Sequence, residues 1–109
     1  MNALLTAAQY RIPVTTVVLN NGVLGWVKDG QRRRHNRFIA SELGKLDYAR
    51  MAHSMGCRGV RVESLADLRP ALDGVRGAAE PTVLDVVTTE DAPFWQVQSP
   101  LAKEGPGGE

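Results

Sequence analysis

The run Asn20-Asn21-Gly22 is the feature of the sequence with the clearest chemical potential. It directly follows an apolar, β-branched stretch at residues 14–19, which is typical of a strand inside a parallel sheet. Ligands of such sheets bind where the strands end, and an asparagine oxygen is an acceptable ligand for Mg²⁺. We therefore consider Asn21 and the carbonyl of Val23 as magnesium ligands, although the same tripeptide also fits an ordinary turn.

Length and composition are those of one small folded domain. The chain has 109 residues, of which 43% are hydrophobic and 23% charged, so general disorder is excluded. A formal net charge of +1 gives no bulk attraction to nucleic acid. A single cysteine, no leader and no long apolar run lead us to expect a soluble, cytoplasmic protein with no membrane and no nucleic-acid partner.

Apolar periodicity and the capping residues Asp47 and Ser64 predict helices that alternate with strands. We expect the helix after Asp47 to bury Tyr48, Met51, Ala52 and Met55, and the helix after Ser64 to bury Leu68, Leu72 and Val75. In chain order we expect a helix ending at residues 11–13, a strand at 14–19, a short helix or mobile loop at 24–34, a helix at 47–56, a strand at 59–63, a helix from residue 64 to about 75, and a strand at 82–88. The strand at 14–19 is apolar on both faces, so we expect it to be central in the sheet.

Strands separated by helices imply right-handed crossovers and a parallel sheet. The predicted fold is therefore a three-layer α/β fold with helices on both faces of the sheet. We divide the chain into a partial domain at residues 1–90 and a carboxy-terminal tail at 91–109. Neither a capping residue nor a strand introduces the first helix, so the predicted fold begins abruptly.

Several other reactive side chains fit structural roles better than catalytic ones. We expect Cys57 to be buried as a small apolar residue and His53 to be exposed on its helix. The basic run at residues 32–35 is interpreted as solvated surface. Asp85 is unusual within a strand, and we expect it to make hydrogen bonds at a sheet edge or an interface.

A family resemblance is carried by VVLNNGVLGWV at residues 17–27, with Gln31 beyond it. This segment resembles the second half of the thiamine diphosphate motif in the acetolactate synthase-like family. Nearly the whole chain continues the likeness, in segments at residues 4–13, 47–49, 55–57, 59–63, 65–72 and 81–87. The resemblance implies the thiamine diphosphate-binding fold with thiamine diphosphate and Mg²⁺ as cofactors.

Carried onto this chain, the resemblance implies that the Asn21 side chain and the Val23 carbonyl hold the metal. The cofactor-binding loop comprises Asn20, Asn21, Gly22, Val23, Leu24 and Gly25. The family's third metal ligand, an aspartate in an upstream Gly-Asp-Gly segment, has no counterpart here. The resemblance therefore implies that the amino-terminal strand of the domain, which bears that segment, is missing. The family's catalytic glutamate belongs to another domain, usually of a neighbouring subunit, so the catalytic residues of this chain are unknown.

The resemblance implies a carboxy-terminal fragment of a 2-oxo acid decarboxylase or carboligase that is inactive alone. Trp26 and Gly30 depart from biosynthetic acetolactate synthases, which usually have Met and Trp there. We expect either a homo-oligomer or association with the missing amino-terminal portion. Two alternatives stay open: a small phosphate- or nucleotide-binding module, and a non-catalytic subunit that docks on a full-length relative.

Overall fold

Three parallel strands and four helices make up the part of the chain that the structure describes. This computed structural model describes residues 2–90, so the predicted tail at 91–109 lies outside the described residues. The elements are α1 (Asn2–Gln9), β1 (Thr15–Asn20), α2 (Gly25–His35), α3 (Tyr48–Ser54), β2 (Arg58–Val62), α4 (Leu65–Val75) and β3 (Thr82–Val87).

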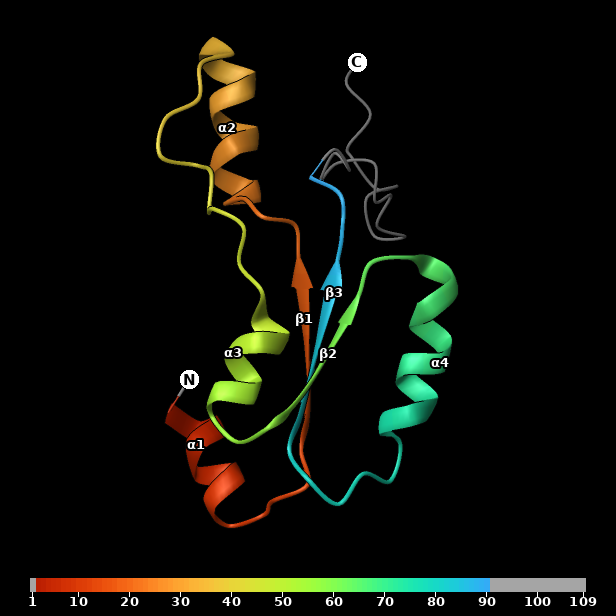
Figure 1. The fold of residues 1–109 in the computed structure, drawn as a ribbon. Helices are drawn as coiled ribbons and strands as arrows, with labels where there is room; N and C mark the ends of the chain where they lie inside the picture. Colours follow the sequence, from red (N-terminus) through yellow and green to blue (C-terminus); the bar gives the residue numbers. More distant parts are fainter. Residues whose placement is uncertain (1, 91–109) are drawn as a thin grey trace, which may run out of the picture.

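The strand order in the sheet is β1-β3-β2, and both pairs are parallel. After β1 the chain leaves the neighbouring position in the sheet empty and forms β2 beyond it. After α4 it forms β3 in the position between β1 and β2. Right-handed crossovers that run in opposite directions place their helices on opposite faces of a sheet. Accordingly, α1 and α3 lie on one face and α4 on the other (Figure 1), which confirms the predicted three-layer α/β fold.

The prediction that β1 is central is wrong for the described sheet, because β3 occupies the middle. All residues of β3 up to Val86 are buried, whereas β1 alternates between half-buried and exposed positions. On the face that α4 covers only in part, Val17 is 47% exposed and Leu19 is 72% exposed. The apolar character of β1 on both faces correctly indicates a strand, but it does not reveal which positions the rest of the chain covers.

Two apolar clusters hold the layers together. Against α4, the buried residues are Val62, Val75, Leu84 and Val86. Against α1 and α3, the buried residues are Ala52, Cys57 and Val83, with Leu4, Ala8, Val18 and Tyr48 partly buried around them. Cys57 is thus buried as predicted, and its thiol donates to the Leu4 carbonyl at 3.5 Å.

The helix ends follow the capping residues read from the sequence. The Asp47 side chain accepts from the Arg50 N–H at 2.8 Å, and Gly56 after α3 has φ +77°. At the start of α4, Ser64 accepts from the Asp67 N–H at 3.2 Å. These contacts satisfy helix-end groups that otherwise lack partners.

Details within α3, α4 and the segment after β1 differ from the sequence prediction. The buried positions of α3 are Ala49 and Ala52, because small residues let this helix approach the sheet closely. Leu72 of α4, predicted to face the core, is 38% exposed, and Ala71 packs there instead. The segment at 24–34, left open as helix or mobile loop, is the helix α2.

Within residues 2–90, no helix is both long and apolar enough to span a bilayer.

Gly59 marks the closest approach of α3 to the sheet. A Cβ atom at this position would lie 2.1 Å from the Ala49 carbonyl oxygen, which belongs to the helix backbone. No side-chain rotation can relieve a contact with backbone, so α3 would have to move away from β2. The glycine is therefore required by packing rather than by a turn.

We predict that Gly59→Ala lowers the free energy of unfolding by about 3 kcal/mol or more, because the added methyl group overpacks the α3 contact. Gly74→Ala is the matched control, since its Cβ would meet nothing within 4 Å inside α4. It should stabilise the chain by about 0.5–1 kcal/mol through helix propensity. Urea unfolding followed by circular dichroism measures both, and equal effects of the two variants would contradict this account.

Candidate functional site

A cavity of about 780 Å³ opens at the carboxyl ends of the strands. This is the edge at which parallel α/β sheets bind their ligands. Its walls come from the ends of all three strands, from the loop after β1 and from the segment before α3. The lining residues are Asn20, Asn21, Gly22, Val23, Glu42, Gly44, Lys45, Leu46, Arg61, Glu63, Val87, Thr88, Thr89 and Glu90.

The turn after β1 is shaped by its own asparagine side chains. The Asn20 Oδ1 accepts from the Gly22 N–H at 3.2 Å, and the Asn21 Oδ1 accepts from the Val23 N–H at 3.3 Å. Gly22 has φ +70°, a conformation that side chains other than glycine rarely tolerate. Asn21 is half-buried and lines the cavity rather than the packed core. An amide oxygen has two lone pairs, so one remains for a ligand.

Val23 is fixed between the turn and the segment at 36–46. It forms an antiparallel bridge with Glu42, and its side chain is 7% exposed. The hydrogen bonds of this bridge are made by the residues on either side of Val23. The Gly22 carbonyl accepts from the Leu43 N–H at 3.0 Å, and the Leu24 N–H donates to the Ser41 carbonyl at 2.8 Å. The backbone that carries the Val23 carbonyl is thereby held on both sides beside the cavity.

Leu24 and Gly25, the last two residues of the predicted cofactor-binding loop, lie away from the cavity that Asn20 to Val23 line. Leu24 precedes α2 and is 43% exposed, and Gly25 is the first residue of that helix. Neither of them lines the cavity. Gly25 nevertheless contributes indirectly, because a Cβ there would lie 3.1 Å from the Asn21 Nδ2. A glycine at this position leaves room for the Asn21 amide above the start of α2.

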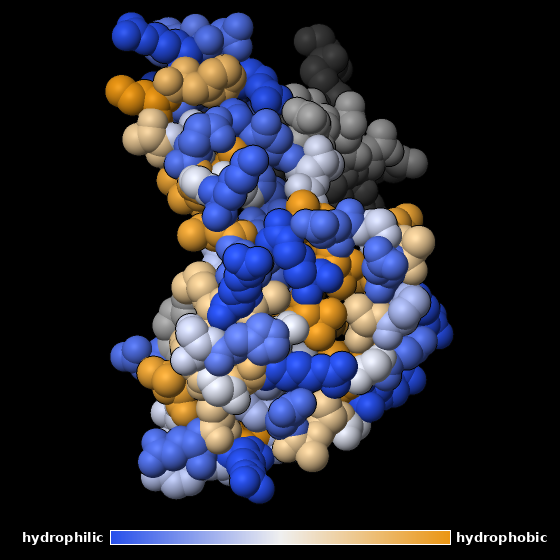
Figure 2. Space-filling view, in the orientation of Figure 1, coloured by the Kyte–Doolittle hydropathy of each residue, from blue (hydrophilic) through white to orange (hydrophobic). Residues whose placement is uncertain are grey.

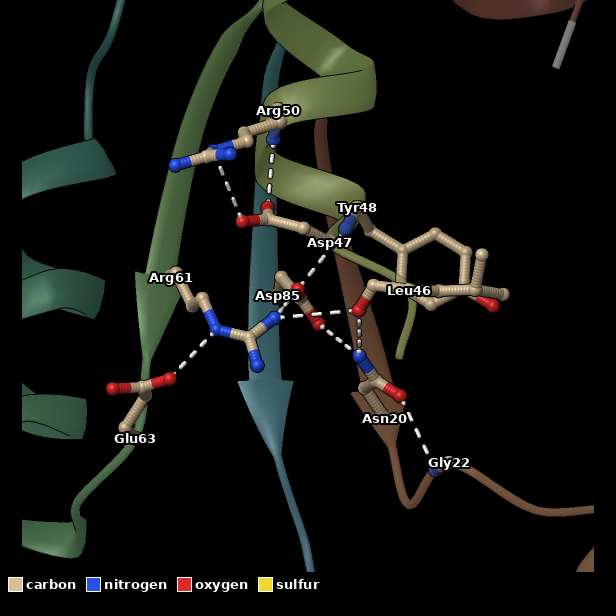
Figure 3. A network of polar contacts seen from close by, with 9 residues as sticks. All are labelled: Asn20, Gly22, Leu46, Asp47, Tyr48, Arg50, Arg61, Glu63 and Asp85. Atoms are coloured by element: carbon tan, nitrogen blue, oxygen red, sulfur yellow. Dashed lines mark hydrogen bonds and ion pairs between the residues drawn. The ribbon is translucent and has the colours of Figure 1, made fainter. Parts of the chain in front are cut away.

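Asp85 organises the polar floor of the site (Figure 3). Its side chain has 0% exposure, although it carries a carboxylate in the middle strand. Its Oδ1 accepts from the Asn20 Nδ2 at 3.0 Å, and its Oδ2 accepts from the Tyr48 N–H at 3.0 Å and from the Arg61 Nη1 at 2.7 Å. The Leu46 carbonyl accepts from the same Asn20 and Arg61 groups, at 3.1 and 3.4 Å. One carboxylate thus connects the end of β1, the start of α3 and β2.

Arg61 is the cation of this network and also lines the cavity. Its Nε donates to Glu63 at 2.8 Å. The hydrogen bond to Glu63 and the nearby negative charges of Asp85 and Glu63 raise the pKa of Arg61 above its ordinary value. The guanidinium therefore remains a permanent positive charge at the cavity wall.

The helix α2 has no buried residues and extends away from the sheet (Figure 1). Two side chains fasten it. Gln31 pairs with both backbone groups of Ile39, donating at 2.9 Å and accepting at 3.1 Å. Lys28, whose side chain is 12% exposed, donates to Glu42 at 2.7 Å and to Glu90 at 2.5 Å. Those hydrogen bonds, to Glu42 first and Glu90 second, raise the pKa of Lys28 above its ordinary value.

Exposed apolar and aromatic side chains lie on α2 and on the segment that follows it, where Figure 2 shows hydrophobic surface beside the hydrophilic end of the helix. Trp26 is 72% exposed and Ile39 is 73% exposed, with Phe38 at 43%. The basic run at residues 32–35 forms the last turn of α2, where cations interact favourably with the helix dipole. His53 is exposed on α3, as predicted.

Asp85, Arg61 and Lys28 are the residues that sequence reasoning missed as parts of the site. Asp85 could have been found from the sequence, because it is a charged residue within the apolar, β-branched run of β3. The prediction that it makes hydrogen bonds is confirmed. Of the two predicted places, a sheet edge or an interface, the sheet edge is wrong, because β3 lies between the other strands of the described sheet. No local pattern signals the contact of Arg61 with Asp85 or those of Lys28 with Glu42 and Glu90, because these partners are distant in sequence.

Three parallel strands that end around an asparagine turn and an open cavity define a ligand-binding α/β domain. Residues 1–86 match the family model described as "Thiamine pyrophosphate enzyme, C-terminal TPP binding domain". The chain therefore belongs to the thiamine pyrophosphate enzyme family and carries part of its C-terminal cofactor-binding domain.

Individual relatives agree with this assignment. The chain is 34% identical over 94 residues to a thiamine pyrophosphate-containing protein of Bacillus subtilis, covering 86% of this chain and 16% of the relative. It is 32% identical over 81 residues to an acetolactate synthase of the same organism, covering 74% and 14%. A solved thiamine diphosphate-dependent 4-hydroxybenzoylformate decarboxylase of Rhodococcus jostii superposes with a TM-score of 0.75 at 30% identity, covering 84% of this chain and 18% of that one. The chain thus spans less than a fifth of each relative's length.

We predict that Lys28→Met lowers the urea midpoint of the chain near neutral pH, because α2 loses both carboxylate partners. Pairing raises the pKa of Lys28, so its stabilising effect is present below the ordinary lysine pKa of about 10.4 and is lost as pH rises through the higher folded value. The difference between variant and wild type should therefore vanish at strongly alkaline pH. Lys45→Met is the control, since Lys45 makes no ion pair within residues 2–90. A midpoint difference that persists unchanged at alkaline pH would contradict the assignment.

Proposed function

We propose that this chain is the carboxy-terminal part of a thiamine diphosphate- and magnesium-binding domain in an acetolactate synthase-like enzyme. That enzyme decarboxylates 2-oxo acids or joins them to an acceptor, and the chain alone is inactive. The observation that carries the proposal is the position of Asn21, Gly22 and Val23 on the wall of a cavity at the carboxyl ends of the strands.

The named relatives support the substrate class. One is an acetolactate synthase, and the solved neighbour is a decarboxylase of 4-hydroxybenzoylformate, which is itself a 2-oxo acid. Both reactions begin by breaking or making a bond next to a keto group. When bound, thiamine diphosphate supplies the electron sink for such chemistry. We place the complete enzyme in the cytoplasm, consistent with a single free cysteine.

The donor set fits a magnesium ion that is bound together with a diphosphate. Mg²⁺ prefers hard oxygens in octahedral geometry and usually keeps waters and phosphate oxygens among its ligands. The Asn21 Oδ1 and the Val23 carbonyl supply two neutral oxygens from one turn. The wall of the cavity is mixed in charge, because Lys45 and Arg61 line it together with Glu42, Glu63 and Glu90. The fit to the metal therefore rests on the oxygen donors of the turn and not on the charge of the wall.

The same donor set explains why the chain alone is proposed to be inactive. Two neutral oxygens leave most of the ion's charge to be balanced by the diphosphate and by groups from elsewhere. The family resemblance implies that an upstream aspartate supplies the charged metal ligand. It implies that the catalytic glutamate comes from another domain. This chain's own residues therefore anchor and orient the cofactor rather than move its protons.

We predict that Mg²⁺-dependent binding of thiamine diphosphate to the full chain is weak and that Asn21→Ala weakens it about tenfold or more, as loss of a metal-site partner does. Isothermal titration calorimetry measures the two dissociation constants. One titration uses thiamine diphosphate with Mg²⁺, and a second uses an adenine nucleotide with Mg²⁺. Preference for an adenine nucleotide would favour the phosphate- or nucleotide-binding module instead. Equal binding by wild type and Asn21→Ala would exclude the assigned metal ligand.

Two glycines of α2 provide a matched pair for the same titration. Gly25→Ala would crowd the Asn21 amide, whereas Gly30→Ala would meet nothing within 4 Å. Both changes raise helix propensity equally. Weaker binding by Gly25→Ala alone would locate the effect at the Asn21 side chain, and equal effects would point to a change in α2 as a whole.

We also propose that the enzyme is a homo-oligomer or associates with a missing amino-terminal portion through β1. In the described sheet β1 is an edge strand, and Val17 and Leu19 leave apolar surface beside it. Unpaired strand edges with exposed apolar side chains favour pairing with another strand.

We predict that the chain sediments as a dimer or larger species and that Leu19→Glu shifts it toward the monomer. Leu65→Glu is the control, because Leu65 is 86% exposed on α4, away from the edge strand. Analytical ultracentrifugation over a concentration series distinguishes the outcomes. A wild-type chain that stays monomeric and folded at high concentration would rule out self-association through β1.

A further inference from the structure

We infer that Asp85 is a positioning residue for the cofactor turn: its buried carboxylate orients the Asn20 amide, and this amide in turn fixes the backbone at Gly22. The inference deepens the proposed function and rests on it for its biological meaning. It concerns a side chain that contacts neither the proposed metal ligands nor the cofactor.

The first step is the orientation of the Asn20 amide. Its Nδ2 donates both to the Asp85 Oδ1 at 3.0 Å and to the Leu46 carbonyl at 3.1 Å. If the amide were rotated by half a turn, its oxygen would face a carboxylate oxygen and a carbonyl oxygen at these distances. Two acceptors in contact without a hydrogen are repulsive, so Asp85 selects one of the two amide orientations.

The second step is the transfer of this orientation to the backbone. With Nδ2 held by Asp85, the Asn20 Oδ1 faces the turn and accepts from the Gly22 N–H at 3.2 Å. This bond accompanies the left-handed φ of Gly22, after which Asn21 and Val23 line the cavity. The two adjacent asparagines therefore have different roles: the first sets the turn, and the second faces the ligand space.

The third step is that Asp85 itself is immobile. It lies in the middle strand with 0% exposure, and its Oδ2 is held by the Tyr48 N–H and by Arg61. A carboxylate fixed by two donors on one oxygen presents its other oxygen in one direction. The position of the turn therefore depends on contacts with β3 and the start of α3, in addition to its covalent link to β1.

An exclusively structural role for Asp85 makes a different prediction from a positioning role. As a structural residue, Asp85 would be needed to the same extent whatever residue 20 is. As a positioning residue, it must match the polarity of residue 20. The exchange of the pair tests this, because an amide at 85 can donate to a carboxylate at 20.

The experiment compares wild type with Asp85→Asn, Asn20→Asp and the double variant, all as full chains without cofactor. Amide hydrogen exchange by NMR reports the protection of the Gly22 N–H. Either single change should speed exchange at Gly22 by about tenfold, the effect of losing one hydrogen bond. In Asn20→Asp two carboxylates face each other, so adding Asp85→Asn should restore part of the protection. The restoration is partial because the Leu46 carbonyl still lacks the donor that Asn20 provides. Asp47→Asn, which changes the neighbouring helix cap conservatively, is the control and should leave Gly22 unchanged.

Additive damage in the double variant, or unchanged Gly22 protection in folded Asp85→Asn, would overturn the inference. If Asp85→Asn alone does not fold, the double variant decides. Folding of the double variant with a protected Gly22 supports the positioning role, and failure to fold contradicts it. Because no cofactor is present, these results are independent of whether thiamine diphosphate binds. A separate titration with thiamine diphosphate and Mg²⁺ that fails in wild type would reject the proposed function alone.

Discussion

The carboxylate of Asp85 has lost all contact with solvent in the middle of the sheet. Removing such a charge from water costs several kcal/mol unless donors replace the lost hydration. The donors here come from three different elements: Asn20 at the end of β1, Tyr48 at the start of α3, and Arg61 on β2. They can converge only because β3 lies between β1 and β2. The strand order and the buried charge therefore require each other, and the cavity opens where both are satisfied.

The two sides of the cavity are built by different means. The wall formed by the strand ends is stabilised by the backbone pairing of β1 with β3, in which Asn20 lies opposite Val87. It is also stabilised by the hydrogen bonds of Asp85. The other side, formed by α2 and the segment after it, has no buried helix residue and depends on contacts made by Lys28 and Gln31. Polar contacts near solvent contribute less than buried packing. Asn21 thus lies on the firmer side, whereas Val23 is bridged to Glu42 in the segment after α2.

The sequence was sufficient for the layers and for the turn after β1. Local signals predicted the helix caps at Asp47 and Ser64, and the asparagine run after a β-branched stretch correctly marked a turn at the carboxyl edge. The position of β1 at the edge of the sheet was missed. Apolar residues on both faces of a strand show that both faces can be buried, but they do not show which strands or helices lie next to it. The contacts of Asp85 with Asn20 and Arg61 were missed because these residues are many positions away from it, and spacing along the chain does not encode such contacts.

The asparagine at position 20 follows from the same constraint. The residue there must donate toward Asp85 and Leu46 on one side and accept from the Gly22 N–H on the other. Aspartate has no donor when ionised, and serine has a single donor that cannot reach two acceptors. Glutamine has both functions but one more methylene group and more rotamer freedom to lose. A short amide is the side chain that meets both demands, so a buried acid on β3 explains why the turn before the proposed metal ligand begins with asparagine.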